Sequence, residues 1–147
     1  MRTARIRGMA GVLIWTEASR FPAMGRFYRD ALGLVPRSSK ADFINFDWNG
    51  VRLSVGVHDR VRGPSAEPLR IMINLAVDDI GVVHARLARA GVVFSRPPER
   101  EDWGGLVATF ADPDGNTLQL MQLPDGGDGA APGRSSRLVP RGGGPTG

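Results

Sequence analysis

The two halves of the chain carry similar patterns of apolar and polar residues, each with strand-like apolar runs around one amphipathic segment. In the first half, apolar residues recur at helical spacing in one segment, and segments with the pattern of strands lie before and after it. Asn49-Gly50 then supplies the dipeptide best suited to a tight hairpin. The predicted elements are a strand at Gly11–Thr16, a helix at 23–32 ended by Gly33, and strands at Phe43–Trp48 and Val51–Val57.

The second half repeats this order. Asp78-Asp79 is a helix-capping pair, and residues 112–116 have the composition of a turn between two strands. The predicted elements are a strand at 71–77, a helix at 80–90, and strands at 106–110 and Thr117–Gln122. Superposing the two turns aligns Asp47, Gly50 and Leu53 with Asp112, Gly115 and Leu118. The chain is therefore predicted to contain two βαβββ modules.

Composition along the chain divides it into a folded part and flanking segments. Residues beyond 123 are rich in glycine and proline and poor in apolar side chains, as in flexible linkers. Leu138-Val139-Pro140-Arg141-Gly142 resembles a thrombin cleavage site. The predicted segments are an N-terminal extension at 1–8, the first module at 9–62, a connector at 63–70, the second module at 71–123, a flexible linker at 124–132 and an appended tail at 133–147.

The formal net charge of +4 would suggest a nucleic-acid partner, but the excess of basic residues lies mostly at the C-terminal end of the chain. Of the 19 basic residues, three lie in 133–147, which has no acidic residue, leaving 16 basic against 15 acidic residues in 1–132. No basic stripe remains, so we expect no nucleic-acid partner. No apolar run reaches the ~18–20 residues of a membrane span, and no leader-like sequence opens the chain. With no cysteine either, we expect a cytoplasmic protein.

Two motifs resemble those of the vicinal oxygen chelate superfamily, which includes glyoxalase I, bleomycin-resistance proteins and extradiol dioxygenases. They lie at residues 27–34 and 112–120, with support from residues 77–79 and Trp103-Gly104. The resemblance covers nearly all of residues 9–123. It implies an α+β fold, in which two paired βαβββ modules form a curved mixed sheet with the helices outside. It also implies a concave groove and, commonly, a homodimer.

Family members that catalyse reactions typically hold a divalent metal in that groove, through His, Glu or Gln at strand positions near the start and end of each module. The matching positions in this sequence are Ala10, Ser54, Met72 and Gln119. Only Gln119 has a side chain of that set, and one neutral ligand does not hold a hard cation against water. We therefore expect no cofactor. The alternative is a divalent metal held by ligands that this alignment misses.

Strand alternation predicts a mostly apolar groove with a few polar groups, as in small-molecule sites. The predicted ligand-binding residues are Ile14, Arg52, Ser54, His58, Met72, Asn74, Trp103, Gln119 and Met121. Arg52 favours an acceptor such as a carboxylate or carbonyl. Two alternatives stay open: His58 lies in the groove or at a solvated strand end, and Trp103 stacks on a ligand or packs at a module edge.

Two functional hypotheses follow. The first is metal-independent binding of a hydrophobic or aromatic small molecule, resembling the drug-sequestering proteins of antibiotic resistance. The second is a glyoxalase- or dioxygenase-like enzyme, a lyase, isomerase or oxidoreductase acting in the same groove. Such an enzyme would use His58, Arg52 or Gln119, or a metal, and the sequence assigns no residue a catalytic role. Metal analysis of the purified protein discriminates between the two.

Overall fold

The computed structural model describes residues 4–125, which form two compact units. Unit 1 comprises residues 4–68 together with Asp112–Asn116, and unit 2 comprises Leu69–Ala111 together with residues 117–125. The predicted tail at 133–147 and most of the predicted linker at 124–132 lie outside the described residues.

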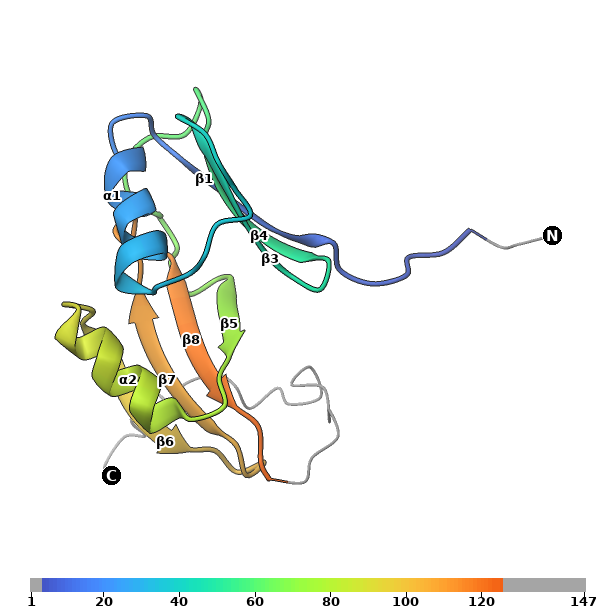
Figure 1. The fold of residues 1–147 in the computed structure, drawn as a ribbon, viewed down its shortest axis with the longest axis vertical. Coiled ribbons are helices and arrows are strands. Elements are labelled where there is room, and N and C mark those ends of the chain that lie inside the picture. Colours follow the sequence, from blue (N-terminus) through green and yellow to red (C-terminus); the bar gives the residue numbers. More distant parts are fainter. Residues whose placement is uncertain (1–3, 126–147) are drawn as a thin grey trace, which may run out of the picture. The chain divides into compact units, whose positions relative to one another are not determined.

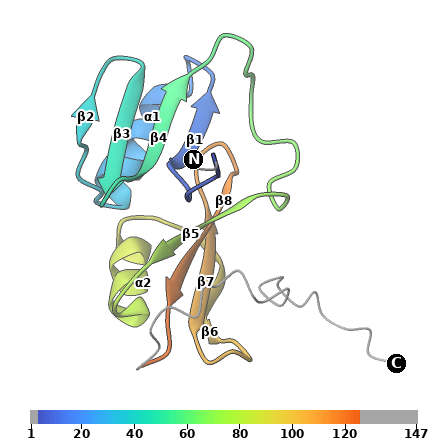
Figure 2. The ribbon, with the colours of Figure 1, turned by 90° about the vertical axis from the view of Figure 1, so that its right-hand side faces the viewer.

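Unit 1 contains a four-stranded sheet with one helical segment on one face. Its elements are β1 (Gly11–Thr16), α1 (Phe21–Gly25), the π-helical η1 (Arg26–Ala31), β2 (Ser38–Ser39), β3 (Phe43–Trp48) and β4 (Val51–Val57). The strand order is β1-β4-β3-β2, with β1 parallel to β4 and the other pairs antiparallel. Figure 2 shows the helix lying behind these strands.

The core of unit 1 lies between this helix and one face of the sheet, because both carry large apolar side chains at matching positions. Tyr28 of η1 and Phe46 of β3 are both almost fully buried, with ring centroids 6.4 Å apart. The helix begins two residues earlier than predicted, at Phe21, since Pro22 fits the first turn, where its missing N–H costs nothing. The hairpin at Asn49-Gly50 is confirmed, with φ angles of 53° and 91°.

Unit 2 has the same arrangement. Its elements are β5 (Met72–Ala76), α2 (Ile80–Arg89), β6 (Phe94–Arg100), β7 (Leu106–Ala111) and β8 (Thr117–Gln122), with strand order β5-β8-β7-β6 and β5 parallel to β8. The predicted cap is present, because the Asp79 side chain accepts a hydrogen bond from the Val82 N–H at 3.1 Å. In Figure 1, α2 lies against one face of these strands. Leu87 of α2 is buried there.

The α+β fold with two modules is confirmed, each with a four-stranded mixed sheet. The βαβββ pattern predicts four strands in each module, but the positions of β2 and β6 were not predicted from the sequence, and both lie at sheet edges. β2 has only two residues, and β6 contains Pro97-Pro98 and two register shifts against β7. Within residues 4–125, no helix has the length and apolar character needed to cross a membrane.

Candidate functional site

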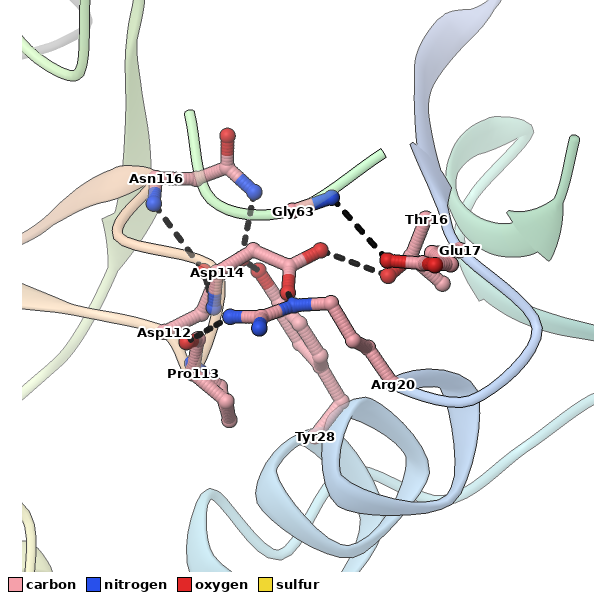
Figure 3. Close-up of polar contacts among 9 residues, drawn as sticks. All are labelled: Thr16, Glu17, Arg20, Tyr28, Gly63, Asp112, Pro113, Asp114 and Asn116. Carbon is pink, nitrogen blue, oxygen red and sulfur yellow. Dashed lines mark hydrogen bonds and ion pairs between the residues drawn. The ribbon is translucent and has the colours of Figure 1, made fainter. Parts of the chain in front are cut away.

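The turn at Asp112–Asn116 belongs to unit 1, although it joins two strands of unit 2, and several side chains form hydrogen bonds with it (Figure 3). Asp114 is 3% exposed and accepts from the Thr16 hydroxyl at 2.6 Å and from the Arg20 Nε at 2.5 Å. Its backbone carbonyl accepts from the Ser65 N–H at 2.7 Å. The turn is thereby fixed to the end of β1, to the start of the helix and to the segment after β4.

Asp112 holds the inside of the same turn. One carboxylate oxygen accepts from the backbone N–H groups of Asp114 and Asn116, at 2.9 and 3.0 Å. The other accepts from the Tyr28 hydroxyl at 2.7 Å and from the Asn116 side-chain amide at 2.9 Å. Burial raises the pKa of Asp112, while the hydrogen bonds from Asn116 and Tyr28 lower it. Both oxygens are engaged within the protein, so we assign this cluster to the fold and not to ligand binding.

Tyr28 offers a direct test of this cluster, because it is the single tyrosine of the chain. Burial, and next the negative charge of Asp112, raises its pKa well above its usual range. The unfolded chain ionises its phenol near pH 10, so stability that is present below that pH is lost as the pH rises beyond it. We expect tyrosinate absorbance to appear only together with unfolding. In Tyr28→Phe, the alkaline loss of stability should be smaller. A titration near pH 10 in the folded protein would contradict the burial of this hydroxyl.

The candidate ligand surface is the face of the unit 1 sheet that points away from the helix, here called the outer face. Arg52 and Ser54 on β4 lie beside Asp47 and Asn45 on β3, and Gly56 lies beside Phe43. On β1, Leu13 and Trp15 lie beside Ser54 and Gly56. The outer face is formed by Leu13, Trp15, Phe43, Asn45, Asp47, Arg52, Ser54 and Gly56.

One end of the outer face is aromatic. The ring centroid of Trp15 lies 6.1 Å from that of Phe43 and 5.2 Å from that of His58. The Trp15 and Phe43 rings lie over Gly56, since a Cβ there would be 2.8 Å from Trp15 Cζ3 and 2.5 Å from Phe43 Cδ2. Trp15 is still 39% exposed. Such a surface favours stacking by a flat apolar ligand.

His58 follows β4 and extends this aromatic end. Its Nδ1 accepts the Arg60 backbone N–H at 3.1 Å, which requires an unprotonated Nδ1 and places the proton of the neutral ring on Nε2. The Asp59 carboxylate lies 3.3 Å from the same nitrogen. The ring therefore contributes a flat edge and one donor nitrogen.

The other end of the outer face is charged. Asp47 Oδ2 lies 3.4 Å from Arg52 Nε and 3.3 Å from Arg37 Nη1, while its Oδ1 accepts the Gly50 N–H at 3.0 Å. That backbone hydrogen bond, and then the charge of Arg37, lowers the pKa of Asp47 against an opposing effect of burial. Between the two ends, the Ser54 hydroxyl donates to the Asn45 side-chain oxygen.

Of the predicted site residues in unit 1, the structure brings Arg52, Ser54 and His58 to the outer-face side. Ile14 is a correction. It pairs with Val55, which is fully buried, so its side chain points toward the helix and is 7% exposed. The neighbouring Trp15 takes the outer position that Ile14 was expected to have. The sequence did not show which residues of β1 pair with which residues of β4. Residues that pair on neighbouring strands point to the same face of the sheet, so Trp15 shares the outer face with Gly56.

The predicted residues in unit 2 are brought together in part. Met72, Asn74 and Met121 lie on one face of the sheet with Gln119, which is buried and donates to the Thr109 hydroxyl at 3.1 Å. Trp103 lies outside the strands, in the loop between β6 and β7. Its ring covers Gly105, where a Cβ would be 1.9 Å from Cζ3, and its indole N–H is buried without a partner among the described residues.

The four positions aligned with family metal ligands do not fit a divalent ion. Ala10 has no side-chain donor, and its carbonyl accepts the Arg52 N–H at 2.9 Å. Ser54 and Gln119 use their polar groups on Asn45 and Thr109. Met72 offers a thioether, which suits soft metals. Within residues 4–125 there is also no group of three or more His, Asp or Glu side chains that could hold a metal ion.

Comparison with known proteins agrees with this architecture. The family model "Glyoxalase/Bleomycin resistance protein/Dioxygenase superfamily" matches residues 18–120. Among solved structures, a glyoxalase/bleomycin resistance protein/dioxygenase from Nocardioides is similar with a TM-score of 0.69 and 19% identity, covering 88% of this chain and 91% of that one. A glyoxalase-related enzyme from Fulvimarina pelagi is similar with a TM-score of 0.64 and 22% identity, covering 80% of this chain and 89% of that one. An uncharacterized protein from Shewanella frigidimarina (strain NCIMB 400) is 39% identical over 56 residues, which is 38% of this chain and 41% of that protein.

Proposed function

Because this chain belongs to the glyoxalase/bleomycin resistance protein/dioxygenase superfamily, we propose that it binds an aromatic small molecule without a metal ion. The observation that carries this proposal is the cluster of Trp15, Phe43 and His58 on the outer face of unit 1. Rings of this kind bind flat ligands through apolar contact and edge-to-face packing. The predicted unit 2 residues Met72, Asn74, Trp103, Gln119 and Met121 stay proposed as ligand-binding residues.

Metal independence is proposed from the chemistry of the donor positions. A catalytic divalent ion needs imidazole or carboxylate ligands, and Ala10, Ser54 and Met72 supply neither. The proposal favours a binding protein over a glyoxalase- or dioxygenase-like enzyme for this reason. The nearby polar groups are also largely engaged in internal hydrogen bonds, as Ser54 is with Asn45.

Binding is tested with a neutral fluorescent probe, N-phenyl-1-naphthylamine, titrated into the purified chain. We expect saturable binding that Trp15→Ala weakens at least tenfold. Trp48→Ala is the matched control, because Trp48 has a similar exposed fraction, 46%, but lies next to Asp47 on β3 and so points to the opposite side of the sheet. Equal effects of the two substitutions would remove the outer face as the site.

Metal independence is tested separately on chelator-treated protein. We expect Zn²⁺, Mn²⁺ or Ni²⁺ to change neither the melting temperature nor the affinity for the probe. A resident site would instead stabilise the folded chain by mass action as the ion is added. A metal-dependent rise in melting temperature, with stoichiometric metal in the untreated protein, would revive the enzyme hypothesis.

A further inference from the structure

We infer that the ligand on the outer face is an aromatic carboxylate, with its ring against Trp15 and its carboxylate at Arg52. This inference rests on the proposed function and adds the charge and length of the ligand. It starts from the change in character along β4, whose successive outer positions are Arg52, Ser54 and Gly56. The first is cationic, the second is a neutral hydroxyl, and the third lies beneath the Trp15 and Phe43 rings.

The charged end has an excess of positive charge. Two guanidinium groups, Arg37 and Arg52, share the single carboxylate of Asp47. Their side chains are 59% and 52% exposed, whereas Asp47 is 17% exposed, so the cations and not the anion face the solvent. A guanidinium has five N–H donors, and Arg52 contacts Asp47 through Nε, while its side chain is half exposed. This arrangement complements a ligand carboxylate.

The spacing sets the length of the ligand. Arg52 and Gly56 are four residues apart on one strand, which corresponds to about 13 Å at the usual rise per residue. The long arginine side chain shortens the gap that the ligand must span. Between the ends, Ser54 is 7% exposed and bonded to Asn45, so this strip supplies contact without a further charge. A ring joined to a carboxylate by a short alkyl chain fits this surface.

Three probes separate the contributions of ring and charge: 4-phenylbutyrate, its neutral amide, and hexanoate. We expect the aryl acid to bind at least tenfold more tightly than either of the other two, with an affinity that falls as salt is added. Arg52→Gln should reduce the affinity for the aryl acid to near that for the amide, and lower the affinity for the amide much less, because a neutral carbonyl gains less from the guanidinium charge. Arg89→Gln on α2 removes the same charge elsewhere and should have no effect.

Asp47→Asn tests whether Arg52 binds the ligand carboxylate or only stabilises the sheet through its ion pair with Asp47. If Arg52 binds the ligand carboxylate, removing the competing Asp47 charge should strengthen binding of the aryl acid. If Arg52 only supports the sheet through Asp47, both substitutions should weaken all probes alike, which would overturn the inference. Equal affinity for acid and amide in the unmodified chain would also overturn it, while the proposed function would survive. Failure of N-phenyl-1-naphthylamine to bind would instead reject the proposed function.

Discussion

Replacement of Asp112 by alanine is expected to lower the free energy of unfolding by about 4 kcal/mol. The change removes the acceptor for the Tyr28 hydroxyl, which is fully buried, and for the N–H groups of Asp114 and Asn116. Each buried donor left without a partner costs about 1–3 kcal/mol. For a domain of this size, the melting temperature should fall by roughly 15 °C. Denaturant unfolding followed by circular dichroism measures the loss.

Asp112→Asn is the matched control. The asparagine oxygen can still accept from the Asp114 and Asn116 N–H groups, and the neutral side chain avoids the burial of charge that raises the Asp112 pKa. We expect a smaller loss, of about 2 kcal/mol, because the asparagine NH2 group cannot accept from the Tyr28 hydroxyl or the Asn116 amide as the second carboxylate oxygen does. Similar large losses in both variants would show that the charge and the second carboxylate oxygen, rather than the hydrogen bonds from the backbone N–H groups, hold the turn.

Most strands and both helices could be predicted because their signals are local. Strands β3 and β4 follow from alternation around Asn49-Gly50, and β8 follows from the turn before it. The placement of the turn itself could not be predicted. Composition shows that residues 112–116 form a turn, but its packing in unit 1 depends on Thr16 and Arg20, more than 90 residues away along the chain. Contacts of that kind leave no local pattern.

The candidate site was half predictable for a related reason. On β4, polar and apolar residues alternate, so the outer positions of Arg52 and Ser54 follow from the sequence. On β1, the run from Gly11 to Trp15 is apolar at successive positions, so the sequence of this strand does not show which residues face the helix and which face outward. The expectation for Ile14 therefore failed where pairing with Val55 decides the face. Gly56 showed no signal of its own, because its role depends on two rings from other strands.

Gly56→Val is expected to have the second largest effect, on both stability and binding. A Cβ at this position would lie 2.5 Å from Phe43 Cδ2 and 2.8 Å from Trp15 Cζ3, and valine adds two further carbons. Overpacking of this kind typically costs 1–3 kcal/mol, which exceeds the gain of about 0.5–1 kcal/mol from removing a glycine from a strand. Because both contacts fall below 3.0 Å, the cost should lie at the upper end of this range, so we expect a net loss of about 2 kcal/mol and at least tenfold weaker binding of N-phenyl-1-naphthylamine.

The cause of that loss can be isolated with Phe43→Ala, which removes the nearer ring. If the two rings over Gly56 are responsible, valine should cost less than 1 kcal/mol in the Phe43→Ala background, giving a coupling energy of at least about 1 kcal/mol between the positions. The emission of Trp15, measured with Trp48 and Trp103 replaced by phenylalanine, supplies a second measurement, because its displacement by valine should expose the indole and shift the spectrum to the red. Additive losses with an unchanged spectrum would mean that the rings do not cover Gly56, and the aromatic end of the outer face would then lose its structural basis.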